Sequence, residues 1–367
     1  MERLPLYGYR ILDLTTAWPG AYATRLLADM GAEVIRVEAA NHRDEPRSDV
    51  HYHVNRNKYA CTLDLGQARG RELFLRLVAL SDAVIEDYRS QVPENSAISY
   101  EDLRSVKADI ILVSLSDHDP SDLTYAAPVS GIAAAGAVAL ALWHRRRAGE
   151  GQHVEVGRLE TEAGLLGEQV LGYSMNRRLP QPTGNRHSSM APHGCYPCAG
   201  DEWVTIAVDD DQRFAALCRV MGRPGLAADT RFADVVSRYR NQDQLDGIVQ
   251  EWTRQLTPQA VTEALQGAGV SAAPLLGVPA LFDDPHLRAR GFWESVSHPD
   301  AGTWDVDGVP WRLSRSPAHI RLPAPRTGEH NEYVLRSLLG LSEEEVRELA
   351  EAGVTGGGPA HGSTGSP

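Results

Sequence analysis

The amino-acid sequence predicts an α/β fold in which a parallel, doubly wound sheet forms a large domain. Short apolar segments alternate with amphipathic segments of helical period through the first half of the chain. Several of these short segments, such as Ile110 to Ser116, are apolar almost throughout, which is typical of strands covered on both faces. Composition then changes between Leu179 and Pro197, which is rich in Pro, Gly, Asn and His and indicates a linker to a smaller α+β domain.

The stretch from Gly8 to Glu38 reads as strand, loop, helix and strand. An apolar run around Ile11 ends before a loop that contains Pro19 and Gly20, and a helix with one apolar stripe follows. Gly31 stands where a left-handed residue ends a helix. In such a βαβ unit the helix N-terminus faces the loop after the first strand and forms an anion site. The glycine fingerprint GxGxxG is absent, so a nucleotide-like ligand is held differently from NAD.

The remaining elements follow from the same patterns. We expect a polar loop over 41–56, a strand over 61–65, and then helices and strands in alternation: 68–80, 83–88, 100–106, 110–116, 129–147, 153–156 and a long helix over 158–174. Beyond the linker we expect a strand over 202–208, helices over 211–221, 244–255 and 258–266, returning strands within 304–320, and a final helix capped by Ser342. The predicted domains are 1–180 (large, first part), 181–199 (linker), 200–295 (small), 296–354 (return to the large domain) and 355–367 (flexible tail).

Composition excludes several classes of protein. The chain has 367 residues and a formal charge of −13, which argues against nucleic acid as a partner. No run of apolar residues is long enough to cross a bilayer, and Met1-Glu2-Arg3 does not begin a secretory signal. Four cysteines in a chain of this length indicate a reducing compartment. We therefore expect a cytoplasmic protein with no membrane partner.

Many segments in the same order give the chain a resemblance to the family III CoA-transferases, the CaiB/BaiF group. These segments are GYRILDLTTAWPGAYATRLLADMGAEVIRVE, NRNKYACTLDL, the end of the strand at Ile85 to Tyr88, HRRRAGEGQHVEV, GNRHSSMAPHGCYPC, DDPHLRARGFW, RTGEHNEYVLRSLLGLS and EEEVRELAEAGV. The group includes formyl-CoA transferases, carnitine CoA-transferases and α-methylacyl-CoA racemases. The resemblance implies a Rossmann-like large domain, a small domain and two ring-shaped chains interlocked as a homodimer; a heterodimer with a paralogue is the alternative.

The resemblance also implies where a coenzyme A thioester binds. In relatives the ligand lies across the loop after the first strand and the ends of neighbouring strands, which fits the crevice at the carboxyl edge of an open sheet. The matching residues here are Thr16, Ala17, Trp18, Pro19, Leu63, Asp64, Leu65, Gly66, Asp87, Tyr88 and Arg89. Trp18 or Tyr88 is expected to stack on adenine, with a core or dimer role for Trp18 as the alternative. Candidate phosphate partners are Arg43, Arg47, Arg56 and Arg89, each of which would otherwise be a solvated surface charge.

The sequence departs from the family where the nucleophile is expected. In the family an aspartate attacks the thioester, forms an acyl-enzyme anhydride and then carries CoA as an aspartyl thioester. That aspartate lies four residues before a glycine that matches Gly131, so its position here is Ala127. The segment from Ser114 to His144 is also shorter than in relatives by roughly thirty to forty residues, which exceeds ordinary variation in loop length. Two basic residues of the family's CoA site correspond to Ala39 and about Asn95.

Other carboxylates are weak candidates for catalysis. Asp122 is the nearest one upstream of Ala127, and Asp117 and Asp119 are weaker still; all three otherwise read as solvated loop acids. Asp210 stands where the racemases carry an acid for proton transfer, although the matching histidine is lost with the shortened segment. The run from Asp209 to Asp211 also has the pattern of a helix cap.

No metal site is predicted. Cys195 and Cys198 have the spacing of zinc ligands, but there is no second pair and only His187 and His193 are near in sequence. His51 and His53 fall in a polar loop and are interpreted as part of it. The predicted ligand is therefore an acyl-CoA or a carboxylic acid without a metal.

Three functions remain open at this point. The first is a CoA-transferase-like enzyme that acts on an acyl-CoA or carboxylic acid with a remodelled site. The second is a catalytically degenerate subunit that pairs with an active paralogue. The third is a repurposed enzyme, such as an isomerase or a racemase-like enzyme, whose chemistry no longer uses a carboxylate nucleophile.

Overall fold

The computed structural model describes residues 4–40, 48–87, 99–116 and 126–356. The chain divides into two compact units, of which the first comprises residues 1–170 and 288–367 and the second residues 171–287. Each unit has its own hydrophobic core.

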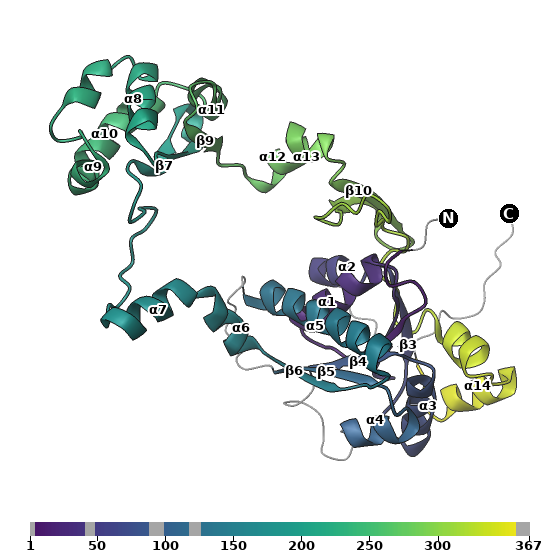
Figure 1. The fold of residues 1–367 in the computed structure, drawn as a ribbon. Coiled ribbons are helices and arrows are strands. Elements are labelled where there is room, and N and C mark those ends of the chain that lie inside the picture. The colour runs from purple at the N-terminus through teal and green to yellow at the C-terminus, as the bar shows by residue number, and fades with distance from the viewer. Residues whose placement is uncertain (1–3, 41–47, 88–98, 117–125, 357–367) are drawn as a thin grey trace, which may run out of the picture. The chain divides into compact units, whose positions relative to one another are not determined.

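Six parallel strands form the centre of the first unit (Figure 1). They are β1 (Arg10–Asp13), β2 (Glu33–Glu38), β3 (Lys58–Thr62), β4 (Ala83–Glu86), β5 (Ile111–Ser116) and β6 (His153–Gly157). Their order across the sheet is β3-β2-β1-β4-β5-β6, so the chain reverses its direction of winding between β1 and β4. Leu12 lies opposite Ile35 on one side and Val84 on the other. The predicted α/β class with a parallel sheet is confirmed.

Helices cover both faces of this sheet (Figure 1). On one face α1 (Trp18–Asp29) packs beside α5 (Ala126–Ala148) over a core that includes Leu27, Ile85 and Val138. The other face carries α3 (Ala68–Ala79), α4 (Tyr100–Val106), a π-helical turn (Tyr333–Leu338) and α14 (Glu343–Glu351). Ser342 caps α14 in a capping box with Glu345, as its sequence predicts.

The edge of the sheet at β3 is covered by the segment around His330. Backbone N–H of His330 donates to the Ala60 carbonyl oxygen at 2.9 Å, and the Ala60 N–H donates to Nδ1 of the His330 ring at 3.2 Å. Asn331 Oδ1 then accepts from the Thr62 N–H at 2.8 Å. These bonds satisfy strand groups that would otherwise be open to pairing with another chain.

Several elements differ from the sequence prediction. A short helix, α2 (Asp49–Val54), lies within the predicted polar loop because Ser48 accepts from the His51 N–H and caps its first turn. The long helix predicted over 158–174 is two helices, α6 (Arg158–Leu165) and α7 (Gly167–Asn176). The strands predicted within 304–320 reduce to β11 (Gly302–Asp307), which pairs antiparallel with β10 (Trp293–His298); Pro310 and Pro317 lack the N–H that a continuing strand would donate.

The second unit has an antiparallel sheet of β7 (His193–Pro197), β8 (Trp203–Ala207) and β9 (Ser271–Pro274), with β8 in the middle. Its core lies against α8 (Asp211–Val220), α10 (Gln242–Thr253) and α11 (Pro258–Gly267), and α9 (Val235–Arg240) precedes α10. Two short helices, α12 (Val278–Asp283) and α13 (Pro285–Ala289), follow β9. β7 lies inside the segment 181–199 that the sequence assigns to a linker.

In the described part of the chain, no helix combines the length and apolar character that a membrane crossing requires. All four cysteines are free thiols.

Candidate functional site

The candidate site lies at the carboxyl edge of the six-stranded sheet, where the loop after β1 meets the ends of β4, β5 and β6. This edge includes the reversal between β1 and β4, which is where open α/β sheets bind ligands. The second turn of α5 reaches the same place, because a Cβ added at Gly131 would stand 2.6 Å from the Pro19 carbonyl oxygen. Glycine at that position therefore lets α5 approach the loop closely.

Asp13 ends β1 and fixes the start of the loop. Its carboxylate accepts from the Thr15 N–H at 2.9 Å, the Thr15 hydroxyl at 2.6 Å and the Thr24 hydroxyl at 2.7 Å. Burial acts to raise the pKa of Asp13, but the charges of Lys58 and Arg36 and these hydroxyl bonds outweigh it, so the pKa is lowered. Asp13 is therefore a buried carboxylate that serves to hold the loop.

Lys58 is the cation that balances Asp13. Its Nζ lies 2.9 Å from Asp13 Oδ2, and it also donates to the Ala21 carbonyl oxygen and to Asn55 Oδ1 at 2.9 Å each. Burial lowers the pKa of Lys58 to about 8, although Asp13 acts in the opposite direction. The strand that begins at Lys58 is thereby tied to the first turn of α1.

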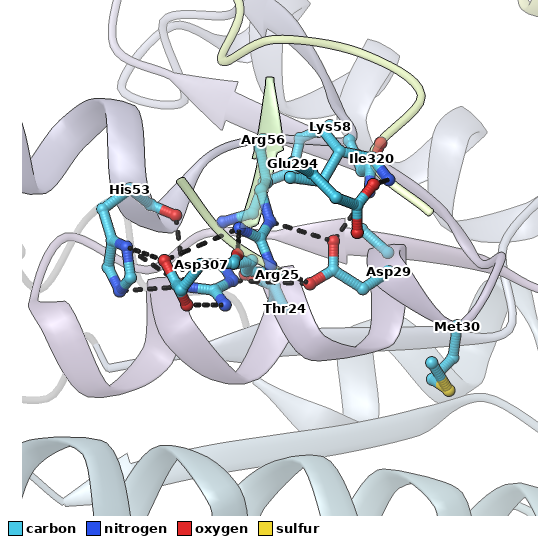
Figure 2. Close-up of polar contacts among 12 residues, drawn as sticks. Thr24, Arg25, Asp29, Met30, His53, Arg56, Lys58, Glu294, Asp307 and Ile320 are labelled. Carbon is cyan, nitrogen blue, oxygen red and sulfur yellow. Dashed lines mark hydrogen bonds and ion pairs between the residues drawn. The ribbon is translucent and has the colours of Figure 1, made fainter. Parts of the chain in front are cut away.

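A second buried ionic cluster lies at the C-terminal half of α1 (Figure 2). Arg56, one of the proposed phosphate partners, is 2% exposed, and its guanidinium donates to Asp29 Oδ2 at 2.9 Å. Arg25 donates to Asp307 Oδ2 at 2.9 Å. The structure thus places Arg56 inside the domain, paired with carboxylates, and not at a surface that a phosphate reaches.

Asp87, which follows β4, holds the other end of the loop. Its carboxylate accepts from the Thr16 N–H at 2.9 Å and from the Ala17 N–H at 2.7 Å. Burial raises the pKa of Asp87, and the hydrogen bonds from Ala17 and Thr16 offset this only in part. The structure therefore brings together three residues that the sequence assigned to the ligand site. Asp87, the carboxylate among these three residues, accepts hydrogen bonds from the backbone N–H groups just before α1.

A small cavity lies directly beside these groups. Its volume is about 10 Å³, which is room for about one water molecule. The residues that line it come from the loop after β1 and the start of α1, from the ends of β4, β5 and β6, from α5, and from the first residue of α6: Ala17, Pro19, Asp87, Leu115, Ser116, Ser130, Val156 and Arg158. A ligand the size of an acyl group enters here only if this edge opens.

Trp18, the first residue of α1, carries a buried indole N–H that has no hydrogen-bond partner in the described part of the chain. The side chain as a whole is partly buried. A buried donor left without an acceptor is uncommon in folded proteins and is often explained by a ligand or water. Trp18 therefore supplies a free donor at the predicted ligand loop.

The segment Leu63–Gly66 has mainly structural contacts. Leu63 is buried in the core beneath α3, and Asp64 accepts from the Gly66 N–H at 3.0 Å and from Gln67 Nε2 at 3.0 Å. Leu65 packs against the same core, whereas Gly66 is exposed. The segment follows β3, two strands from β1, which corresponds to a separation of about 10 Å.

Several predicted site residues lie outside the described residues. They are Tyr88 and Arg89 of the ligand site, the further phosphate candidates Arg43 and Arg47, the position Asn95, and the carboxylates Asp117, Asp119 and Asp122. Residue 127, which the sequence analysis assigned to the position of the family's aspartate, falls in the first turn of α5, one turn before Gly131.

Asp210 lies in the second unit and caps α8. Its Oδ1 accepts from the Arg213 N–H at 2.7 Å, and its Oδ2 pairs with the Arg213 guanidinium at 3.1 Å. This is the helix-cap alternative for Asp210 that the sequence left open.

The structure also locates the Cys195–Cys198 and His187–His193 pairs. Cys195 lies in β7 and Cys198 directly after it. The rings of His187 and His193 lie 5.3 Å apart, centre to centre. In the described ranges of the chain, no three His, Cys, Asp or Glu side chains converge as metal ligands would.

One series of hydrogen-bonded polar side chains beside the site was missed by the sequence analysis. The Ser114 hydroxyl donates to Glu86 Oε1 at 2.8 Å and lies 2.9 Å from Nε2 of His153, whose ring stacks on Tyr100. Glu86, Ser114 and His153 lie on three adjacent strands, so only strand register brings them together. The signal available beforehand was a polar residue near the end of each apolar strand.

Comparison with known proteins gives a consistent result. The sequence profile of CoA-transferase family III matches residues 6–122 and 119–331, in two parts that meet between β5 and α5. A succinyl-CoA–D-citramalate CoA-transferase of Chloroflexus aurantiacus is 29% identical over 389 aligned positions, which cover 94% of this chain and 96% of the relative. Because 389 exceeds the 367 residues of this chain, the relative carries residues that have no counterpart here.

Two further proteins extend the comparison. The β subunit of a succinyl-CoA–L-malate CoA-transferase from the same organism is 28% identical, with 94% of this chain and 97% of that subunit aligned. A crystal structure of a CaiB/BaiF family protein from Brucella suis superposes with a TM-score of 0.81 at 25% identity, covering 92% of this chain and all of that one.

Proposed function

The chain belongs to CoA-transferase family III, and from this premise we propose that it binds an acyl-CoA thioester at the carboxyl edge of its six-stranded sheet. We further propose that it takes part in moving CoA between that thioester and a small carboxylic acid. The observation that carries the proposal is the loop after β1, whose backbone N–H groups are fixed by Asp87 and which presents Trp18 at its end.

The chemistry of this edge supports a thioester ligand. The buried indole N–H of Trp18 lacks an acceptor among the described residues, and a thioester carbonyl or carboxylate oxygen is a suitable acceptor. The small cavity between Asp87 and α5 marks the point where the reactive end of the ligand would lie once the edge opens. The proposed contacts are Thr16 to Pro19 and Asp87, with Leu65 to Gly66, Tyr88 and Arg89 towards the nucleotide end.

The names of the relatives support a dicarboxylic acid as the acid partner. One relative is named for succinyl-CoA and D-citramalate and another for succinyl-CoA and L-malate. Citramalate and malate are both hydroxydicarboxylic acids of four carbons in the main chain. We therefore take succinyl-CoA with a small hydroxydicarboxylic acid as the first substrate pair to assay.

This proposal has two forms, which differ in the chain that supplies the nucleophilic carboxylate. Alanine at position 127 has no group that attacks a thioester, so a chain that transfers CoA by itself needs another carboxylate, of which Asp122 is the nearest in sequence. The alternative is a chain that binds the thioester while a paralogue supplies the aspartate. The break of the profile match at residues 119–122 is the observation that favours a shortened segment here, whereas the longer alignment with the citramalate relative does not say where its extra residues lie.

A transfer assay tests the proposed reaction. The purified chain is mixed with succinyl-CoA and L-malate or D-citramalate, and new acyl-CoA is separated by chromatography. Hydroxylamine added to a parallel sample converts any aspartyl thioester to a hydroxamate, which peptide mass spectrometry then locates. The self-sufficient form predicts a modified Asp122 and loss of turnover in Asp122→Ala, with Asp109→Ala as the control.

A variant with a restored aspartate tests the alternative form. If the chain binds CoA but has no nucleophile, wild type gives no hydroxamate and Ala127→Asp gives one at residue 127. Turnover without any covalent adduct in wild type would instead favour the repurposed enzyme, whose chemistry does not use a carboxylate nucleophile.

Pairing with a second chain is supported by apolar surface on α5 and α6. Leu140 and Trp143 on α5 and Leu159 on α6 are each more than half exposed. Apolar side chains in such number on neighbouring helices mark interaction surfaces. We propose that a second copy, or a paralogue, covers them; light scattering of the purified chain distinguishes a homodimer from a monomer that awaits its partner. The four free thiols support the cytoplasmic location predicted from the sequence.

A further inference from the structure

A second hollow lies in the first unit, between α2 and the β10–β11 hairpin. Its volume is about 260 Å³, and it is lined by Asp49, Tyr52, His53, Ala301, Trp304 and Val306. None of these residues lines the cavity at the carboxyl edge of the sheet. The volume is slightly below the usual range for pockets that hold drug-sized molecules, so it suits a small ligand.

Aromatic rings form the wall of this hollow. The rings of Tyr52 and Trp304 meet at an interplanar angle of 72° with their centres 5.5 Å apart, which makes a corner. His298 packs behind them, with its ring centre 5.1 Å from that of Tyr52. The faces of tyrosine and tryptophan rings carry partial negative charge and attract cations.

The histidines beside the hollow do not add positive charge. Arg25 has only donors, and its guanidinium nitrogen lies 2.8 Å from Nε2 of His53, so that ring nitrogen accepts. The proton of His53 is then on Nδ1, which faces Asp307 Oδ1 at 3.1 Å (Figure 2). Nδ1 of His298 likewise accepts, from the N–H groups of Asp300 and Ala301. Both rings are therefore neutral in this arrangement.

Among the residues that the structure describes, the remaining charges leave the hollow with a net negative rim. Arg25 and Arg56 are balanced by the two carboxylates of Asp29 and Asp307. Asp49 is exposed, and the structure gives its carboxylate no hydrogen-bond or ion-pair partner among the described residues. An aromatic corner with one free carboxylate beside it favours a cation and disfavours an anion.

We propose that this hollow is a binding site for a small organic ammonium cation. The cationic head lies in the corner of Tyr52 and Trp304, and Asp49 supplies the counter-charge. This site is separate from the proposed thioester site, because the polyanionic CoA is repelled by the same carboxylate that attracts the cation.

Three ligands of one shape and different charge test the proposal. Choline is the cationic probe, 3,3-dimethyl-1-butanol is its neutral counterpart, and 3,3-dimethylbutanoate is its anionic counterpart. Binding to the full chain is measured by calorimetry and by shifts of the tryptophan indole signals in NMR spectra. We expect choline to bind at least about five-fold more tightly than the neutral probe, and the anion to be weaker still.

Two variants and one control locate the site. Trp304→Ala removes one wall, and Asp49→Asn removes the exposed carboxylate without touching the core; each should weaken choline by about five-fold or more. Glu101→Gln makes the same change in net charge on α4, on the other face of the sheet, and should change nothing. Equal affinity for choline and the neutral alcohol, no binding of choline, or binding unaffected by Asp49→Asn would each overturn the proposal.

Discussion

Lys58 Nζ lies 2.9 Å from Asp13 Oδ2, and both side chains are fully buried. Asp13 also binds both the backbone and the hydroxyl of Thr15, so the pair connects the start of β3 to the loop on which the proposed ligand site depends. Lys58, the last residue of the NRNK segment, thus serves to fix the loop after β1 from inside the domain.

Breaking the Lys58–Asp13 pair should destabilise the fold strongly. Lys58→Met leaves the Asp13 carboxylate buried without its cation, and Asp13→Asn leaves Lys58 without its anion; we expect each to lower the free energy of unfolding by about 3–5 kcal/mol. Urea denaturation measures both, and the double variant should lose less than the sum of the two. Arg347→Met, which removes an exposed ion pair on α14, is the control and should cause no measurable loss. Two single variants as stable as wild type would contradict this account of the loop.

Trp18→Phe separates a ligand role for the indole from a structural one. The indole N–H has no partner among the described residues, so its removal should leave stability unchanged or slightly higher. If the N–H donates to the thioester ligand, the dissociation constant for acyl-CoA rises by about five- to ten-fold. Thermal unfolding and calorimetry on the same sample provide both readings. Lost stability with unchanged affinity would assign Trp18 to the core or to a dimer contact.

Stability should fall with acid below neutral pH because of His330. Its ring accepts from the Ala60 N–H in the neutral form, and burial lowers its pKa. The unfolded chain, with an ordinary histidine pKa near 6.5, therefore binds more protons than the folded chain. The free energy of unfolding therefore decreases as pH falls below that value.

The matched test for His330 compares two histidine variants. His330→Gln keeps an acceptor for the Ala60 N–H and should flatten the pH dependence between pH 7 and 5. His319→Gln changes an exposed histidine and should leave that dependence as in wild type. Identical pH profiles for all three proteins would show that His330 contributes nothing to acid sensitivity.

Asp307 should act at lower pH than His330, and its pKa is shifted in the same direction, downward. Burial acts to raise its pKa, but the bond with His53 and the charges of Arg25 and Arg56 lower it to about 2. A depressed pKa contributes stability that is present above the unfolded value near 3.9 and lost as pH falls towards 2. Asp307→Asn should reduce stability at pH 7 by about 2–4 kcal/mol, since it leaves Arg25 without one of its carboxylates. A variant that retained the full acid transition of wild type between pH 4 and 2 would contradict this assignment.

Local patterns in the sequence were sufficient to predict the six-stranded sheet and most of its helices. Continuous apolar strands and stripes of helical period predicted β1 to β6, α1, α3 to α5 and α14, and the capping signal at Ser342 was read correctly. The family resemblance, which agrees with the rule that parallel strands share a carboxyl edge, also placed Thr16, Ala17 and Asp87 at one edge, where they make hydrogen bonds. These features depend on neighbours in sequence or on the general rules of parallel sheets.

Local sequence patterns could not predict which charged residues are buried or how they pair. Arg25 and Asp307 are separated by 282 residues, and polar residues such as Arg56 have the local signature of a surface loop. Only the tertiary fold reveals that Asp29 and Asp307 pair with them. For the same reason the sequence did not predict the hydrogen bonds that join Glu86, Ser114 and His153, because these residues lie on three different strands.

The central claim is that the loop after β1, fixed by Asp87, binds a CoA thioester. The most direct test is a calorimetric titration of wild type, Asp87→Ala and Asp109→Ala with succinyl-CoA. Removing the Asp87 carboxylate would by charge alone favour a polyanion, but it also frees the N–H groups of Thr16 and Ala17 and loosens the loop. We predict binding to wild type and to Asp109→Ala, whose aspartate precedes β5 at the amino edge of the sheet, and affinity at least about ten-fold weaker for Asp87→Ala. No heat from wild type at millimolar succinyl-CoA, or tighter binding by Asp87→Ala, would contradict the account.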